Sequence, residues 1–305
     1  MRKALEGVNI LIQAGLAFKN VSVLAEATLD AGADWLDVQF DPRSAAALET
    51  LQSRIETAGR CFVTQGGFHP GVPAALVRWA AMQLDTLETA DVIGVLRPKG
   101  GMQYTEAVEE LIDLFRDYKA HLWRDGAWQR VTGAKASDYK TFDTAFGMGR
   151  NRGAPLELDE MKPLPQMFPT IREMGMYVAG FGTFGENAAA MIMLGGLKLL
   201  PWVKGSTWGR FYCWATRTFA KQPYGVAVQL DARGIRTGKE VNLRLALFHE
   251  DGYELTAIPV VAMLEQMLDG SAHRAGLFRM GLLVNPEPML AAVEQMGVKV
   301  FREIK

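Results

Sequence analysis

Residues 8–71 read VNILIQAGLAFKNVSVLAEATLDAGADWLDVQFDPRSAAALETLQSRIETAGRCFVTQGGFHPG, and this stretch decides the fold. Three short apolar runs, at 8–14, 33–40 and 61–65, have the length and composition of buried strands. Helical patterns alternate with them. We predict helices from Asn20 through Asp30 and from Ser44 through Ala58, closed by Gly32 and Gly59, and a third helix from Pro73 to Leu84. Strands joined through helices by such short connections predict a parallel sheet with right-handed crossovers.

Three loops of this segment would lie at the carboxyl edge of the sheet, where open parallel sheets bind their ligands. They are Gly15 with its neighbours, Asp41-Pro42, and the run from Gly66 to Gly71. Glycines in the last loop permit close backbone approach or positive φ. His69 is its one titratable side chain, a candidate proton donor or acceptor. The alternative is a turn whose glycines only let a strand meet a helix.

The rest of the chain predicts an α+β arrangement with a mostly antiparallel sheet. Residues 121–131 form a predicted hairpin around the turn Asp125-Gly126. A fourth apolar run covers 90–96, and Gly252 is predicted to begin a turn. Further strands are predicted at 226–231, 241–248 and 298–301, and helices at 105–119, 258–268 and from Asn285-Pro286 to Gly297. The fold class is therefore α/β, a partial doubly wound parallel sheet with an inserted α+β domain.

Composition excludes several classes of protein. The 305 residues are 49% hydrophobic and 22% charged, which is typical of a globular chain. Lys and Arg number 33 against 34 Asp and Glu, a net charge of −1 that gives no case for nucleic-acid binding. Cys61 and Cys213 lie far apart and share no metal-ligand spacing with the four histidines, so neither a disulfide scaffold nor a metal site is predicted. We expect a cytoplasmic protein without a signal peptide, and Glu186 interrupts the most apolar stretch, 174–197.

Two segments in the second half of the chain are candidates for a functional site. Gly180 to Gly185 match G-x-G-x-x-G, but no Asp or Glu occurs from Asn187 through Leu230, where a ribose-binding acid would be needed. We interpret the match as a glycine-rich bend rather than a cofactor site. The same acid-free stretch interleaves five basic residues with aromatic ones. It would cover a sheet or form a dimer contact, or else meet an anionic or amphipathic ligand such as a lipid surface.

Four motifs resemble the saccharopine dehydrogenase-like family of NAD(P)-dependent oxidoreductases. Leu5 to Gly15 resembles the strand before the family's cofactor loop, although Ala14-Gly15-Leu16-Ala17-Phe18 lacks its proline. Ala31 to Asp37 resembles the strand that follows. Gly67-Phe68-His69-Pro70-Gly71 is similar to the family's Gly-Phe-Asp-Pro-Gly loop, with His69 in place of Asp. Gly252 to Ala257 resembles a late strand-to-helix segment. The similarity spans nearly the whole chain, above all residues 5–85 and 225–300.

The resemblance implies hydride transfer between NAD or NADP and a small imine, amino-acid-derived or enoyl or lipid-like substrate. It implies that residues 1–88, joined by about 285–305, form the second half of a Rossmann-like domain, and that 89–284 form a substrate and dimerisation domain. Family members carry the glycine fingerprint in βαβ units ahead of the strand that begins here at Val8, so the activity of this chain by itself stays open. His69 would be catalytic, and the cofactor would be contacted by Ala14, Gly15, Gly67, Phe68, Pro70 and Gly71.

Two other readings remain. One is a non-catalytic binding or scaffold protein that retains the fold, and the other is a lipid-surface protein that uses the basic aromatic segment. We expect a small-molecule substrate and a homodimer, with no nucleic-acid partner, and a membrane surface only in the last reading.

Overall fold

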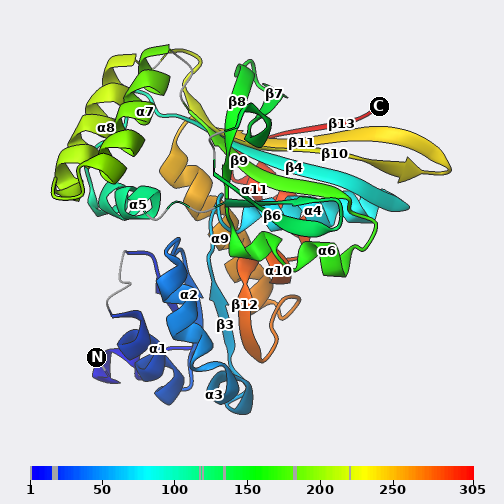
Figure 1. The fold of residues 1–305 in the computed structure, drawn as a ribbon. Helices are drawn as coiled ribbons and strands as arrows, with labels where there is room; N and C mark the ends of the chain where they lie inside the picture. The colour runs from blue at the N-terminus through cyan, green and yellow to red at the C-terminus, as the bar shows by residue number, and fades with distance from the viewer. Residues whose placement is uncertain are drawn as a thin grey trace. The chain divides into compact units, whose positions relative to one another are not determined.

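The computed structural model describes residues 2–15, 20–116, 118, 120–132, 135–180, 184–219 and 221–305 (Figure 1). The chain forms two compact units. Unit 1 comprises Met1–Met82, Asp159–Leu164 and Tyr253–Val298, and unit 2 comprises Gln83–Leu158, Pro165–Gly252 and Lys299–Lys305. The late segment of unit 1 thus begins at Tyr253 instead of about 285, and the last seven residues belong to the other unit.

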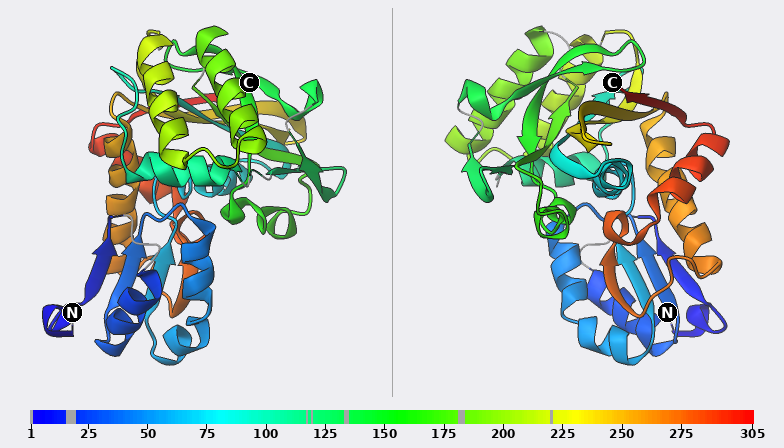
Figure 2. Two further views of the ribbon diagram at one scale, coloured as in Figure 1. Left: turned by 60° about the vertical axis from the view of Figure 1, so that its left-hand side comes forward. Right: turned by 90° about the vertical axis from the view of Figure 1, so that its right-hand side faces the viewer.

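Unit 1 contains the predicted parallel sheet. Its strand order is β1 (Ile10–Gln13), β2 (Asp34–Asp37), β3 (Cys61–Thr64) and β12 (Gly276–Arg279), and every neighbouring pair is parallel (Figure 2). The first three strands confirm the predicted runs. The fourth, β12, was not predicted, because four residues of which only Gly276 is buried carry little periodic signal. The apolar run at 90–96 belongs to the sheet of unit 2.

The helices of unit 1 follow most of the predicted limits. Gly32 and Gly59 have positive φ, as the predicted helix ends require. The single helix from Ser44 to Ala58 is wrong: the chain forms two helices there. Asp41 caps the first, its Oδ1 accepting from the Arg43 amide at 2.8 Å, with Pro42 as the first helical residue. Gly252 begins a helix, not a turn. The helices are α1 (Val21–Asp30), α2 (Pro42–Glu49), α3 (Gln52–Thr57), α4 (Val72–Gln83), α9 (Gly252–Leu268), α10 (Met280–Leu283) and α11 (Pro286–Gln295), with short 3-10 turns at Arg2–Leu5 and Asp159–Met161. The short helix α6 (Leu164–Met167) lies mostly in unit 2.

One hydrophobic core of unit 1 lies between the parallel sheet and the helices that cover it. Trp35 and Phe62 are partners across β2 and β3, and their rings stack at 6.0 Å between centroids. Helices α1, α2 and α3 cover them with buried aliphatic side chains, which are Val21, Ala25, Leu29, Leu48, Leu51 and Ile55. Helix α4 is tied to the late segment, because Trp79 Nε1 donates to Glu287 at 2.6 Å and Arg78 donates to the carbonyls of Gly281 and Val284.

Unit 2 is built on a nine-stranded, mostly antiparallel sheet (Figure 1). Among the described strands of this sheet, only β4 and β9 pair in parallel. The predicted hairpin is confirmed, with Asp125 and Gly126 both at positive φ. The predicted C-terminal strand forms, but it pairs with β11 in this sheet rather than joining the parallel one. The strands are β4 (Thr86–Arg97), β5 (Ala120–Arg124), β6 (Ala127–Val131), β7 (Lys140–Thr144), β8 (Gly149–Leu156), β9 (Glu173–Ala179), β10 (Gly225–Arg236), β11 (Lys239–His249) and β13 (Lys299–Ile304), with a short 3-10 turn at Ala136–Asp138.

Three helices of unit 2 form a separate cluster beside the sheet (Figures 1 and 2). They are α5 (Glu106–Arg116), α7 (Phe184–Leu199) and α8 (Gly205–Phe219). Their shared core contains Val108, Ile112, Met193, Leu197, Tyr212 and Cys213. In the part of the chain that the structure describes, none of the helices has both the length and the apolar character needed to span a bilayer.

Candidate active site

The carboxyl ends of the four parallel strands bring the predicted loops to one edge of unit 1. Ala14 and Gly15 follow β1 and are exposed, and Gly66 to Gly71 follow β3. The Gly15 carbonyl accepts hydrogen bonds from Gln13 Nε2 at 2.8 Å and from Gln39 Nε2 at 2.6 Å. The segment after β2 therefore holds the loop after β1. The remaining positions of that predicted loop, Leu16, Ala17 and Phe18, lie outside the described residues.

A buried carboxylate that the sequence did not single out organises this edge. Asp37 ends β2 and is fully buried. Its Oδ2 accepts from Trp35 Nε1 at 2.7 Å. Its Oδ1 accepts from Thr64 Oγ1 at 2.9 Å and from the backbone amides of Gln39 and Gln65, each at 3.0 Å. Burial raises the pKa of Asp37, and the four donors oppose that rise by stabilising the anion. By binding the amides of Gln39 and Gln65, Asp37 thus fixes the path of the backbone after β2 and after β3.

The glycine-rich loop after β3 is packed tightly within unit 1. A Cβ on Gly66 would lie 2.8 Å from the Asp37 carbonyl oxygen, and one on Gly71 would lie 2.6 Å from the Gly67 carbonyl oxygen. Gly67 and Gly71 also have φ of +136° and +112°. Phe68 and Pro70 are buried. The glycines therefore allow close packing within unit 1, as in the alternative of a turn in which a strand meets a helix. Because these contacts lie inside the protein, the loop presents little backbone to a ligand.

His69 lies in this loop as a half-buried ring. It stacks on Phe68 with 3.9 Å between ring centroids and 24° between planes, and Phe40 lies 6.1 Å away. Burial disfavours the charged imidazolium and lowers the pKa of His69 to about 4. The ring is therefore neutral near pH 7 and has the protonation state of a proton acceptor.

Glu160 is the second buried carboxylate of unit 1 that the sequence did not indicate. Its Oε2 accepts from the Gly71 amide at 2.9 Å and its Oε1 from the Ala74 amide at 3.4 Å, so it satisfies free amides at the N-terminus of α4. Burial raises the pKa of Glu160 to about 7, against the effect of these two amides and of nearby Arg279. No local pattern marks a lone glutamate that arrives from a distant short turn. The anion-binding end of α4 is thus already filled by the protein itself.

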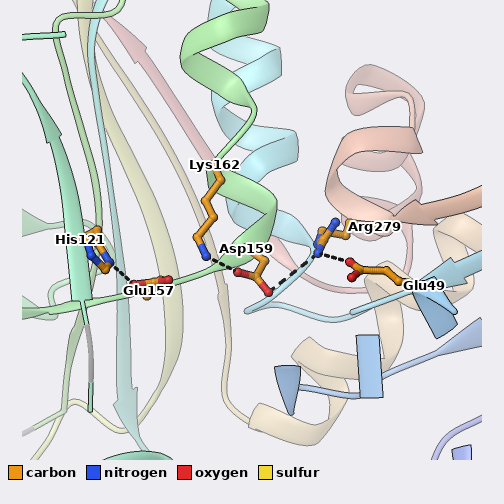
Figure 3. A network of polar contacts seen from close by, with 6 residues as sticks. All are labelled: Glu49, His121, Glu157, Asp159, Lys162 and Arg279. Atoms are coloured by element: carbon orange, nitrogen blue, oxygen red, sulfur yellow. Dashed lines mark hydrogen bonds and ion pairs between the residues drawn. The ribbon is translucent and has the colours of Figure 1, made fainter. Parts of the chain in front are cut away.

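Asp159, which directly precedes Glu160 in the sequence, forms an ion-pair network with Arg279 (Figure 3). Arg279, at the end of β12, donates to Glu49 at 3.0 Å and lies 3.8 Å from Asp159. Asp159 also accepts from Lys162 at 2.6 Å. These contacts hold the turn that carries Glu160 against the carboxyl edge of the sheet.

Glu160 should make the stability of the protein depend on pH in a defined direction. Its folded pKa of about 7 exceeds the ordinary 4.5, so the folded state binds a proton that the unfolded state releases between these values. The contribution is complete below the ordinary pKa and is lost as pH rises toward 7, at about 1 kcal/mol per pH unit. His69, with a folded pKa of about 4, contributes the opposite trend between about pH 4 and 6.5, so the two effects oppose each other in the wild type. Urea unfolding across this range should therefore show that the stability of the wild type relative to Glu160→Gln falls as pH rises. The exposed Glu56→Gln variant should keep the wild-type slope, and an unchanged slope in Glu160→Gln would contradict the assignment.

Four buried polar atoms at this end of unit 1 have no hydrogen-bond partner among the described residues: the acceptors Gln39 Oε1 and Gln65 Oε1, the hydroxyl Ser44 Oγ and the donor Arg279 Nε. A buried acceptor without a donor is costly, so such atoms call for a water or a ligand group. Two amide oxygens suit a ligand that donates from an uncharged NH₂ or OH group, such as a carboxamide. The described residues at this edge therefore fit the nicotinamide end of a dinucleotide, and they offer no comparable cradle for its phosphates.

The other sequence candidates lie elsewhere. At the G-x-G-x-x-G match, Phe181 to Thr183 lie outside the described residues, and a Cβ on Gly180 would lie 2.5 Å from the Leu96 carbonyl oxygen. His121 pairs with Glu157 (Figure 3), and His273 Nε2 lies 2.8 Å from Asp34. Within the described ranges, no three His, Cys, Asp or Glu side chains gather in a way that would hold a metal ion.

Comparison with known proteins gives similarity at the level of structure. No protein-family model matches the chain, and no curated protein sequence matches it. Apo saccharopine dehydrogenase (L-Glu forming) from Saccharomyces cerevisiae is similar over 99% of this chain and 86% of its own, with a TM-score of 0.70 at 13% identity. DAP dehydrogenase from C. glutamicum in complex with DAP covers 94% of this chain and 80% of its own at 13% identity, but its TM-score of 0.45 carries no weight for the fold. With the parallel sheet and the mixed sheet in place, the chain has a saccharopine dehydrogenase-like, Rossmann-like α/β fold.

Proposed function

We propose that this protein is an NAD(P)-dependent oxidoreductase that transfers hydride to or from a small imine, amino-acid-derived, enoyl or lipid-like substrate. The observation that supports this most is the similarity of 99% of the chain to a saccharopine dehydrogenase, together with a loop cluster at the carboxyl edge of the parallel sheet. Fold similarity at 13% identity supports the class of reaction only by analogy. The choice between NAD and NADP is left to experiment.

In this proposal the nicotinamide end of the cofactor meets the loop after β1. Ala14 and Gly15 are exposed there, and the amide oxygens of Gln39 and Gln65 would accept hydrogen bonds from the carboxamide. The site would be supported from inside unit 1 by four residues that are buried there, Gly67, Phe68, Pro70 and Gly71. Asp37 would position both groups, since it binds the amides of Gln39 and Gln65.

The bound nicotinamide would supply the hydride acceptor or donor, and His69 would manage the proton. In the oxidative direction the substrate loses a hydride from one carbon and a proton from the adjacent atom, which is nitrogen in an amine that becomes an imine and carbon in an acyl group that becomes an enoyl group. The neutral ring of His69 accepts that proton, and in the reductive direction the same ring returns it. Its lowered pKa makes the protonated form a strong donor.

Cofactor binding can be measured directly on the purified chain. A dinucleotide present at about 100 times its Kd should stabilise the folded state by about 3 kcal/mol and raise the Tm by about 5 °C. We expect this shift with NADH or NADPH in the wild type and a smaller one in Gln39→Leu, each relative to its own cofactor-free Tm. The exposed Gln52→Leu variant is the matched control and should shift as the wild type does. The absence of any shift with both dinucleotides would refute the proposed cofactor.

The proposed role of His69 is tested by measuring turnover. With a substrate class that supports dinucleotide oxidation or reduction, His69→Ala should lower kcat about 100-fold, the usual range for a general base. The His249→Ala variant removes another half-buried histidine, in unit 2, and should leave kcat unchanged. Equal turnover in the wild type and His69→Ala would remove the histidine from the mechanism without affecting the cofactor proposal.

The scaffold alternative is favoured by one specific observation. Glu160 already satisfies amides at the N-terminus of α4, and the glycines before that helix are filled by protein atoms. A non-catalytic protein would keep such an arrangement for stability alone. This alternative requires a well-folded chain that neither dinucleotide stabilises.

A further inference from the structure

The turn between α7 and α8 exposes an unusual run of apolar side chains. Residues 198–204 read KLLPWVK. Leu199 is 76% exposed and Trp202 is 75% exposed, and Leu200 between them is also exposed. Tryptophan rarely faces water to this extent in a folded protein, and contiguous exposed apolar residues indicate an interaction site.

This turn is ordered by its own backbone. The Leu200 amide donates to the Gly196 carbonyl at 2.8 Å, the Val203 amide to the Leu200 carbonyl at 3.0 Å, and the Thr207 amide to the Lys204 carbonyl at 3.0 Å. Successive bonds of this kind carry the chain from the end of α7 into the start of α8. The exposed side chains therefore project from a fixed turn, so holding them in place costs little additional conformational entropy on binding.

The packing of the helical cluster does not use these side chains. Its core is formed by other residues of the same helices, such as Leu197 and Tyr212. Trp208 fills the space beside α7, where a Cβ on Gly196 would lie 2.0 Å from its ring. Leu199 and Trp202 face water, whereas Met193 and Leu197 of the same helix α7 are buried, so stability of this cluster alone does not account for them.

The charged side chains of the turn and of α8 have one sign, although Glu109 of α5 lies nearby, where it accepts from the Tyr104 hydroxyl beside Arg210 and Ser206. Lys198 and Lys204 flank the turn and are exposed, and Arg210, Arg217 and Lys221 follow along and after α8. No acidic residue occurs between 187 and 230, although the whole chain carries a net charge of −1. An apolar tip between cations matches the interface of a lipid bilayer, where anionic headgroups meet acyl chains and tryptophan is favoured.

We propose that the α7–α8 turn is a docking site for a membrane surface with anionic lipids, into which Leu199, Leu200 and Trp202 insert while Lys198 and Lys204 bind headgroups. A nucleic acid would use the cations but would leave the leucines exposed. A second copy of the chain would bury the apolar side chains but would place two sets of lysines together. The inference is independent of the proposed redox activity, because it rests on unit 2 alone.

Vesicle co-sedimentation of the full chain tests the proposal. We expect binding to phosphatidylcholine vesicles that contain phosphatidylserine, weaker binding to phosphatidylcholine alone, and loss of binding at high salt. Trp202→Ser should reduce affinity about tenfold, and the double change Lys198→Glu with Lys204→Glu should reduce it about a hundredfold. These residues are exposed, so the Tm of each variant should equal that of the wild type.

Two matched control variants distinguish binding at this turn from nonspecific binding to vesicles. Leu268→Gln removes a leucine that is 69% exposed in α9, and Lys239→Glu reverses an exposed lysine at the start of β11. Both should bind vesicles as the wild type does. Absence of sedimentation, or equal sedimentation of all variants, would overturn the proposal. So would lipid-free self-association in analytical ultracentrifugation that Trp202→Ser abolishes, because it would assign the turn to a second copy.

Discussion

Asp37→Ala is expected to lower the free energy of unfolding by about 5 kcal/mol, because it leaves several buried donors without an acceptor. The carboxylate accepts four hydrogen bonds, from the Trp35 indole, the Thr64 hydroxyl and two backbone amides. Alanine fills none of these positions, and the site has no exposed surface through which water could replace them. Urea unfolding of the purified variant, followed by near-UV circular dichroism, would measure the loss.

Two further variants establish the cause. Asp37→Asn keeps one oxygen that can accept from Thr64 and the amides, but it points an NH₂ group at the Trp35 indole, so we expect roughly half the loss of alanine. Asp30→Ala removes an exposed aspartate whose surface ion pair with Arg54 contributes less than about 1 kcal/mol. A loss below about 1 kcal/mol in Asp37→Ala would mean that the buried hydrogen bonds do not hold the edge of the sheet.

The local part of this fold could be predicted from the sequence. The strands β1, β2 and β3 lie within short stretches rich in apolar residues, and Gly32 and Gly59 end helices because they adopt positive φ. These features depend on a few neighbouring residues, so they are visible without the structure. The break between α2 and α3 was missed because the run from Ser44 to Ala58 contains no glycine or proline.

The pairing of strands that lie far apart in the sequence was harder to predict from the sequence. β12 joins the parallel sheet beside β3, about 200 residues later in the chain, and β13 joins the other sheet. Each strand is short, so its partner is decided by tertiary contacts and not by its own pattern. The same reason hides Asp37 and Glu160. Their hydrogen bonds connect segments that only the fold brings together, whereas His69 was visible from its glycine-rich surroundings.

Gly71→Ala is expected to cost about 4 kcal/mol, since it combines backbone strain with overpacking at the start of α4. The φ of Gly71 is +112°, which L-residues rarely adopt. The new Cβ would lie 2.6 Å from the Gly67 carbonyl oxygen, 2.9 Å from the Gly67 amide nitrogen and 2.8 Å from Met280 Cε. Two of these are backbone atoms that cannot rotate away, so the loop itself must open. Thermal and urea unfolding would measure the loss.

A local readout distinguishes this mechanism from general destabilisation. The Val72 amide donates to the Gly67 carbonyl at 3.0 Å, and opening the loop should abolish the hydrogen-exchange protection of that amide. Gly59→Ala is the matched control, because its φ is +65° but no atom lies within 4 Å of the new Cβ. It should therefore cost only the local strain, about 1 kcal/mol, and leave Val72 protected. Equal losses in the two variants would show that positive φ alone, and not the close packing of the loop against Gly67, makes glycine necessary at position 71.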